Sequence, residues 1–292
     1  LGSLNGEKVV DVFKQGGVII HVMNSEPSFK EGDQVQGQID IERRKQLAQH
    51  HSSTHIVNAA AKRVLGSHIN QAGAKKTTEK AHIDLTHYES LSDEQIKNIE
   101  TQANKIVKQA IPLNLQFMSR DEAEKKYGMT IYQGGAIPGN KLRIVEIPGV
   151  DVECCGGTHL KNTSEAEIIK IQKSTKISDG IIRITFVAGE AAKRELSAGD
   201  NVASELTKLL GVNAEMIPAR AQELFTKWKK AKKLDNNAQI NIKDFELTST
   251  DISKGDILAE TCMILKTQPE HLVNTVKRFK TELEEIIAGF KK

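Results

Sequence analysis

Gln49-His50-His51-Ser52-Ser53-Thr54-His55 is the stretch around which the fold of this chain can be worked out. It lies within residues 41–65, where neither proline nor glycine occurs and where residues of similar character recur at helical spacing. The pattern predicts one long helix over 41–65, ended by Gly66. Residues four apart on a helix point the same way, so the imidazoles of His51 and His55 can reach one ion.

A second pair of metal-binding residue types follows about a hundred residues later. Cys155 and His159 enclose a glycine-rich turn in the sequence Glu-Cys-Cys-Gly-Gly-Thr-His, residues 153–159. A His-x-x-x-His pair alone is weak evidence for metal, because histidines often serve as buried polar residues of a core. Three histidines and one cysteine together are a donor set typical of tetrahedral zinc. Residue 52 is Ser, whereas zinc proteases carry their basic Glu at that position, so this class of hydrolase is excluded.

Composition limits the remaining classes. The chain has 292 residues, 38% of them hydrophobic, and a net charge of only +3, which gives no global sign of nucleic-acid binding. No apolar run approaches the ~20 residues that cross a bilayer. Three cysteines without a signal peptide favour a reducing, cytoplasmic compartment. Because residue 1 is Leu and a strand pattern begins at once, we expect the chain to be a piece of a longer protein.

The predicted fold class is α+β with a helical C-terminal region. Strand patterns over 8–13, 18–22 and 34–41 predict a partial β-barrel in residues 1–40. Residues 41–188 alternate predicted helices (41–65, 92–110, 120–127) with strands (80–88, 113–118, 142–147, 167–172, 181–187), which favours a mostly antiparallel sheet. Residues 189–292 read as helices 190–210, 218–233, 254–265 and 269–290, with a weak strand over 240–247. The helices repeat at an offset of 55 residues, which suggests two helical hairpins, although a chance likeness explains the pattern nearly as well.

Four motifs together resemble a known family. They are His-His-Ser-Ser-Thr-His (50–55), Ile-Asn-Gln-Ala-Gly (69–73), Ile-Asp-Leu-Thr-His (83–87) and Cys-Gly-Gly-Thr-His (155–159). Their order and spacing resemble the editing domain of alanyl-tRNA synthetases over about residues 1–190. Tyr-Gly-Met (127–129), Tyr-Gln-Gly-Gly (132–135) and Pro138-Gly139 resemble the archaeal branch, and the helical tail resembles the region that follows editing in archaeal enzymes.

The resemblance implies an activity and a site. The activity is hydrolysis of Ser-tRNA(Ala), and also of Gly-tRNA(Ala), made in error elsewhere in the enzyme. One zinc ion would be held by His51, His55, Cys155 and His159. The family's contact to the serine hydroxyl falls on Thr54, and a glutamine that affects editing falls on Gln71. A hydrophobic pocket that binds alanine cannot strongly reject serine for its one extra hydroxyl. A second site that hydrolyses the wrong product is therefore needed.

Other site residues are predicted only from their nearness to the motifs or from their positive charge. His87 and Asp151 are candidates for a general base because they adjoin motif residues, although such residues more often have structural roles. The partner tRNA(Ala) would be held through its phosphates by basic residues. The residues that we expect to do this are Arg43, Arg44, Lys75, Lys76 and Lys161. The C-terminal region could also serve a homodimer.

The sequence departs from the family pattern in two places. The glycine-rich stretch that precedes the zinc helix in the family is missing. A class II synthetase core is also missing, so ATP, Mg²⁺ and alanine activation belong to an N-terminal aminoacylation domain of the parent alanine–tRNA ligase, which would be a partner of this part.

Three alternatives stay open. One is a freestanding editing protein that acts in trans, which would need further barrel strands upstream. Another is the editing domain of threonyl-tRNA synthetase, against which the Gly-Gly-Thr between Cys155 and His159 argues. The last is a non-catalytic RNA-binding module with a structural zinc, which would bind tRNA without hydrolysing the ester.

Overall fold

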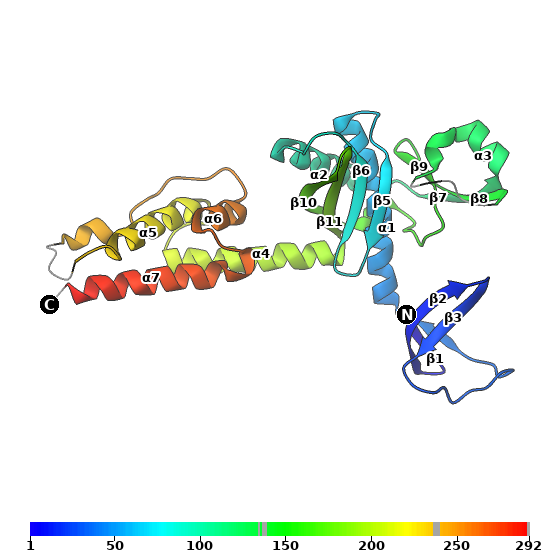
Figure 1. The fold of residues 1–292 in the computed structure, drawn as a ribbon, viewed down its shortest axis with the longest axis horizontal. Helices are drawn as coiled ribbons and strands as arrows, with labels where there is room; N and C mark the ends of the chain where they lie inside the picture. Colours follow the sequence, from blue (N-terminus) through cyan, green and yellow to red (C-terminus); the bar gives the residue numbers. More distant parts are fainter. Residues whose placement is uncertain (134, 136–138, 236–239, 291–292) are drawn as a thin grey trace. The chain divides into compact units, whose positions relative to one another are not determined.

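The computed structural model describes residues 1–133, 135, 139–235 and 240–290 (Figure 1). They form two compact units, Leu1–Arg194 and Glu195–Lys292. Gly134 and Pro138, two residues of the archaeal-type segment, lie outside the described residues. None of the helices in the described part of the chain combines the length and the apolar character that a bilayer span requires.

The first unit begins with a small antiparallel sheet. Its strands are β1 (Gly2–Leu4), β2 (Glu7–Gln15), β3 (Val18–Met23) and β4 (Gly37–Ile39), in the order β3-β2-β1-β4. The predicted strands correspond to β2, β3 and a shortened β4. The sequence pattern did not predict β1, which lies between β2 and β4 and pairs Gly2 with Val9 and with Ile39.

The central layer is a four-stranded antiparallel sheet covered by two helices. Strands β5 (Gln71–Lys76), β6 (Ala81–Thr86), β10 (Ile169–Ser178) and β11 (Ile181–Ala188) lie in the order β10-β11-β6-β5. The alternation on β6 buries Ile83 and Leu85 completely, and these side chains belong to one core with residues of α1 (Ile41–Leu65) and α2 (Asp93–Lys108). The helix α1 has the predicted bounds and carries the two histidines along this core.

A third antiparallel sheet precedes the glycine-rich turn of residues 155–159. Strands β7 (Asn114–Ser119), β8 (Lys141–Ile147) and β9 (Asp151–Cys154) lie in that order, and α3 (Arg120–Tyr127) packs on them. The sequence pattern predicts a strand over 142–147 that leads directly into the turn, and it does not predict β9. In β9, Asp151 pairs with Ile147 and Cys154 pairs with Ile144. Because side chains alternate along a strand, Asp151 and Glu153 share one face of β9.

The second unit is helical. It contains most of α4 (Glu190–Leu210), then α5 (Ile217–Ala231), α6 (Ile257–Leu265) and α7 (Leu272–Gly289). Its core includes a stack of Trp228 on Phe279 with ring centroids 4.2 Å apart. Short 3₁₀ turns at Ala214–Met216 and Pro269–His271 precede α5 and α7, so the same element recurs at the offset of 55 seen in the sequence.

The weak strand prediction for 240–247 was wrong. Residues Ile242–Phe245 form a 3₁₀ turn with Phe245 buried. Side chains of α5 bind the backbone that follows: Arg220 donates to the carbonyls of Leu247 and Ser249, and Glu223 accepts from the N–H of Thr248. Backbone groups that are bound by side chains have no need of a partner strand. The α+β prediction with antiparallel sheets and a helical C-terminal region is confirmed.

Candidate metal centre

The structure brings the four predicted ligand residues together. His51 and His55 lie one turn apart on α1, and Cys155 and His159 lie on the loop that follows β9. The Sγ of Cys155 lies 3.1 Å from Nε2 of His51 and 3.4 Å from Nε2 of His159. One donor atom from each of the four residues lies within 4.8 Å of all the others.

These distances suit a tetrahedral metal ion. With bonds of ~2.3 Å to sulfur and ~2.05 Å to nitrogen, donor atoms at tetrahedral corners are about 3.3–3.6 Å apart. The two Cys155 distances lie close to that range, and the other donor atoms are at most 4.8 Å apart. The residues present therefore could hold a metal ion, and the mixture of thiolate and imidazole is compatible with zinc.

The loop between Cys155 and His159 can approach α1 because residue 157 is glycine. A Cβ at Gly157 would lie 1.9 Å from Cε1 of His51, so any other residue here would force the His51 ring or the loop to shift. Arg143 on β8 fixes the same loop by donating to the carbonyl oxygens of Cys155 at 2.6 Å and Gly157 at 2.8 Å. On the other side, Oγ of Ser52 accepts from the N–H of Leu160 at 3.0 Å, which ties the loop to α1.

The electrostatics of the cluster favour a thiolate at Cys155 and neutral imidazoles at His51 and His159. Burial would lower the pKa of His55, but Glu153, Asp151 and Cys155 raise it well above its ordinary value. Burial alone would raise the pKa of Cys155, but hydrogen bonds with His159, His51 and His55 lower it to about 2. Burial lowers the pKa of His51, and it lowers the pKa of His159 to about 4. Metal ions bind the deprotonated form of each of these groups, so Cys155, His51 and His159 are prepared for a metal, whereas His55 has to lose a proton on binding.

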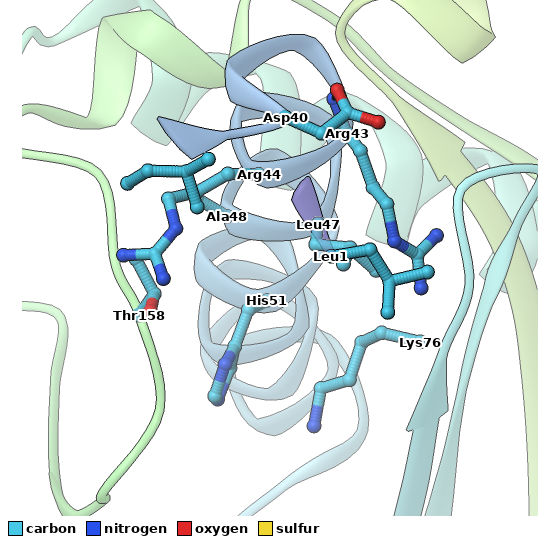
Figure 2. Close-up of a pocket in the computed structure, with 10 residues that line it drawn as sticks. Leu1, Asp40, Arg43, Arg44, Leu47, Ala48, His51, Lys76 and Thr158 are labelled. Carbon is cyan, nitrogen blue, oxygen red and sulfur yellow. Dashed lines mark hydrogen bonds between the residues drawn. The ribbon is translucent and has the colours of Figure 1, made fainter. Parts of the chain in front are cut away.

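A cavity of about 280 Å³ adjoins the cluster at His51. Three cationic side chains line it, and Figure 2 shows Arg44 on one side of His51 and Arg43 and Lys76 on the other. Its lining is Leu1, Ile39, Asp40, Arg43, Arg44, Leu47, Ala48, His51, Lys76 and Thr158. A small group carrying negative charge could thus enter beside the metal ligands.

A family model and several known proteins match this chain in sequence. A family model described as the second additional domain of threonyl and alanyl tRNA synthetases matches residues 142–185, which include Cys155 and His159. The alanine–tRNA ligase of Methanocella arvoryzae is 48% identical over 241 residues, which are 82% of this chain. That of Methanococcus maripaludis strain C5 is 42% identical over 88% of this chain, and that of Methanococcus aeolicus is 37% identical over 98%.

This chain belongs to the alanine–tRNA ligase family. It spans less than a third of the length of these relatives: 27%, 29% and 32% of the three ligases, respectively. Since the family model covers β8 to β11 and the longer matches extend across the rest of the chain, the region corresponds to the editing part of an alanine–tRNA ligase.

The other site residues predicted for this ligase region lie apart from the cavity. Thr54 is fully buried, and its hydroxyl donates to the carbonyl of His50 at 2.8 Å. The N–H of Gln71 donates to Oε1 of Gln133 at 2.9 Å. The Nδ1 of His87 lies 2.8 Å from Nε2 of His68, on which the ring stacks. None of the three predicted residues lines the cavity beside His51.

The predicted RNA-binding residues divide into two groups. Arg43, Arg44 and Lys76 line the cavity, whereas Lys75 and Lys161 are exposed and do not. Neighbouring residues on a strand face opposite ways, which separates Lys75 from Lys76 on β5.

Sequence reasoning also missed residues that shape the site. Arg143 gave no signal, since one arginine on a strand has no recognisable pattern. Glu153 stood inside the quoted motif without a role, and its alternation with Asp151 would have revealed it if β9 had been predicted. The candidate base Asp151 lies against His55, with Oδ2 3.1 Å from Nδ1.

Proposed function

We propose that this region hydrolyses the ester bond of Ser-tRNA(Ala), and of Gly-tRNA(Ala), at a zinc centre held by His51, His55, Cys155 and His159. The observation that carries the proposal is that four side chains able to hold a metal ion adjoin a cavity lined by three cationic side chains. An aminoacylated RNA end has the matching chemistry, with a small amino acid ester next to phosphates. Bound zinc supplies Lewis acidity at such a site.

The cations of the cavity bind the RNA end and orient it. Arg43 and Arg44 come from the first turn of α1, and their guanidinium groups suit phosphate oxygens, which planar donor pairs bind bidentately. Lys76 enters from β5 and adds a point charge nearer the strand side. Holding the phosphates in this way places the terminal ester near the His51 face of the donor set, and positioning of this kind lowers the barrier to attack by water.

Serine is selected by a hydroxyl group of the protein. Thr158, on the loop between Cys155 and His159, is one of the residues that line the cavity and carries such a hydroxyl. Thr54, on which the family's serine contact falls, is buried outside this cavity with its hydroxyl donating to the His50 carbonyl, so Thr158 is the residue that the geometry favours. A protein group that is hydrogen-bonded by serine and left unpaired by alanine gives discrimination that size alone cannot give.

The test is release of serine from Ser-tRNA(Ala) by the purified chain, with Ala-tRNA(Ala) as the control substrate. His51→Ala and Cys155→Ala should lose both the metal and the activity. If either variant hydrolyses Ser-tRNA(Ala) at the wild-type rate without metal, the centre has been assigned wrongly.

One observation favours a second candidate function. Four protein ligands fill a tetrahedral zinc site, as in structural rather than catalytic centres. A zinc-stabilised module that binds tRNA without hydrolysis would show zinc-dependent RNA affinity and no serine release. The same assay separates this candidate from editing when RNA binding is measured in parallel.

A further inference from the structure

The far edge of the His55 ring faces two carboxyl groups. Its Nδ1 lies 3.1 Å from Oδ2 of Asp151 and 3.1 Å from Oε2 of Glu153. All three side chains are withdrawn from water, with exposed fractions of 3% for His55, 10% for Asp151 and 4% for Glu153. Because Nδ1 faces the two carboxyl groups, Nε2 on the opposite edge of the ring is the nitrogen that is left for the donor set.

The strand β9 and the helix α1 build this contact together. Asp151 and Glu153 lie two residues apart on β9, so both face α1. Asn58, three residues after His55 on the helix, donates from Nδ2 to Oε1 of Glu153 at 3.0 Å. Each oxygen of Glu153 is therefore bound by a side chain of α1, and the carboxylate cannot turn away from His55.

We propose that Asp151 and Glu153 are positioning residues that fix the tautomer and the orientation of the ligand His55. A proton held on Nδ1 by the two carboxyl groups leaves the lone pair of Nε2 free for the metal. A ligating histidine usually gives its other N–H to such a partner, which raises the basicity of the ligand and fixes its ring. The inference rests on the proposed zinc centre and not on hydrolysis.

Charge balance supports the same role. Zinc with one thiolate and three neutral imidazoles carries a net charge of +1, which is costly to bury without a counter-charge. Two carboxyl groups directly behind His55 supply that counter-charge. The position also removes Asp151 from the candidates for a general base, because it does not line the cavity where the ester would lie.

The same atoms allow one competing arrangement. Nδ1 of His55, Asp151 and Glu153 could themselves hold an ion, since their donor atoms lie within 4.8 Å of one another. A second ion there would take the place of the proton on Nδ1. The number of zinc ions bound per chain separates the two arrangements: one ion fits a positioning role, and two ions fit the competing site.

The experiment measures zinc stoichiometry and zinc affinity of the full chain by competition with a chromophoric chelator. The variants are Glu153→Gln and Asp151→Asn, which remove charge and keep size. The matched control is Glu146→Gln, a half-buried carboxylate on the neighbouring strand β8 with no contact to His55. Circular dichroism of the metal-free chains establishes that each variant is folded, and if Glu153→Gln is not, the more exposed Asp151→Asn decides.

The expected result is one zinc per wild-type chain and an affinity that is about 10–100-fold weaker in each carboxyl variant, with the control unchanged. The visible absorption bands of the cobalt-loaded variants should shift as well, because the ligand field that His55 exerts on the metal changes. Unchanged affinity in a folded variant would overturn the role of that carboxylate and leave the zinc centre intact. Two zinc ions per chain would also overturn the inference, while no zinc at all would overturn the centre on which it rests.

Discussion

Replacing Gly157 with alanine should expel His51 from the metal centre. The added methyl carbon would lie 1.9 Å from Cε1 and 2.4 Å from Nδ1 of His51, whereas ordinary contacts of a Cβ lie at 3.4–4 Å. An ordinary contact would require a displacement of about 1.5 Å, whereas metal–ligand bonds tolerate only about 0.2 Å. The ring cannot be displaced this far and remain a ligand.

The expected loss can be bounded. Removing a residue that merely supports a ligand weakens metal affinity by about 10–100-fold, so losing the ligand itself should cost at least about 100-fold in zinc affinity. Gly156→Ala is the matched control, because a Cβ at that position has no atom within 4 Å. It should bind zinc like the wild type.

The assay is zinc competition with a chromophoric chelator, followed by circular dichroism of both variants without metal. Equal zinc affinities of the Gly157→Ala and Gly156→Ala variants would refute the reasoning. That result would mean that the loop can move away from α1 without cost, or that His51 is not a ligand.

Three further predictions concern the substrate and the helical unit. Lys76→Gln should weaken tRNA binding and lower the slope of log K against log salt by about 1, while Lys75→Gln, its exposed neighbour on β5, should have a smaller effect; equal effects would argue against the cavity as the RNA site. Thr158→Val should reduce the preference for Ser-tRNA(Ala) over Ala-tRNA(Ala), and Thr54→Val tests the other hydroxyl in the same assay; if neither variant alters the preference, selection of serine does not depend on these groups. Burial would raise the pKa of Glu223, but hydrogen bonds from Lys227 and from the segment at Ser249 lower it to about 2. Since this lies below its ordinary value of 4.5, the stabilisation is complete above that pH and is lost as the pH falls toward 2. Thermal unfolding of Glu223→Gln should therefore show a weaker dependence on pH over this range, and an unchanged dependence would refute the assignment.

Much of the fold was predictable because local signals agree with the tertiary structure. The helix α1 begins where Asp40 accepts from the N–H of Arg43 and ends at Gly66, whose φ of 116° suits glycine. Likewise, Ser119 and Glu122 form a capping box that starts α3 at the predicted residue. In both helices the residues that decide the ends lie within a few positions of them.

The missed elements depend on partners that are distant in sequence or on side-chain contacts. Strand β9 has only four residues and exists through its pairing with β8, which a short segment cannot reveal. The 242–245 turn is decided by Arg220 and Glu223 on another helix. The residue types predicted the cluster of His51, His55, Cys155 and His159, whereas the contacts of Arg143 and Glu153 needed the loop and strand to be placed.

Serine release from Ser-tRNA(Ala) by the zinc-loaded chain is the measurement that tests the central claim most directly. The account predicts release that is faster than from Ala-tRNA(Ala), that disappears with the zinc-binding variants His51→Ala and Cys155→Ala, and that returns when zinc is restored to a chelated wild-type sample. Tight zinc-dependent binding of tRNA without any release of serine would contradict it and would identify the region as a zinc-stabilised RNA-binding module.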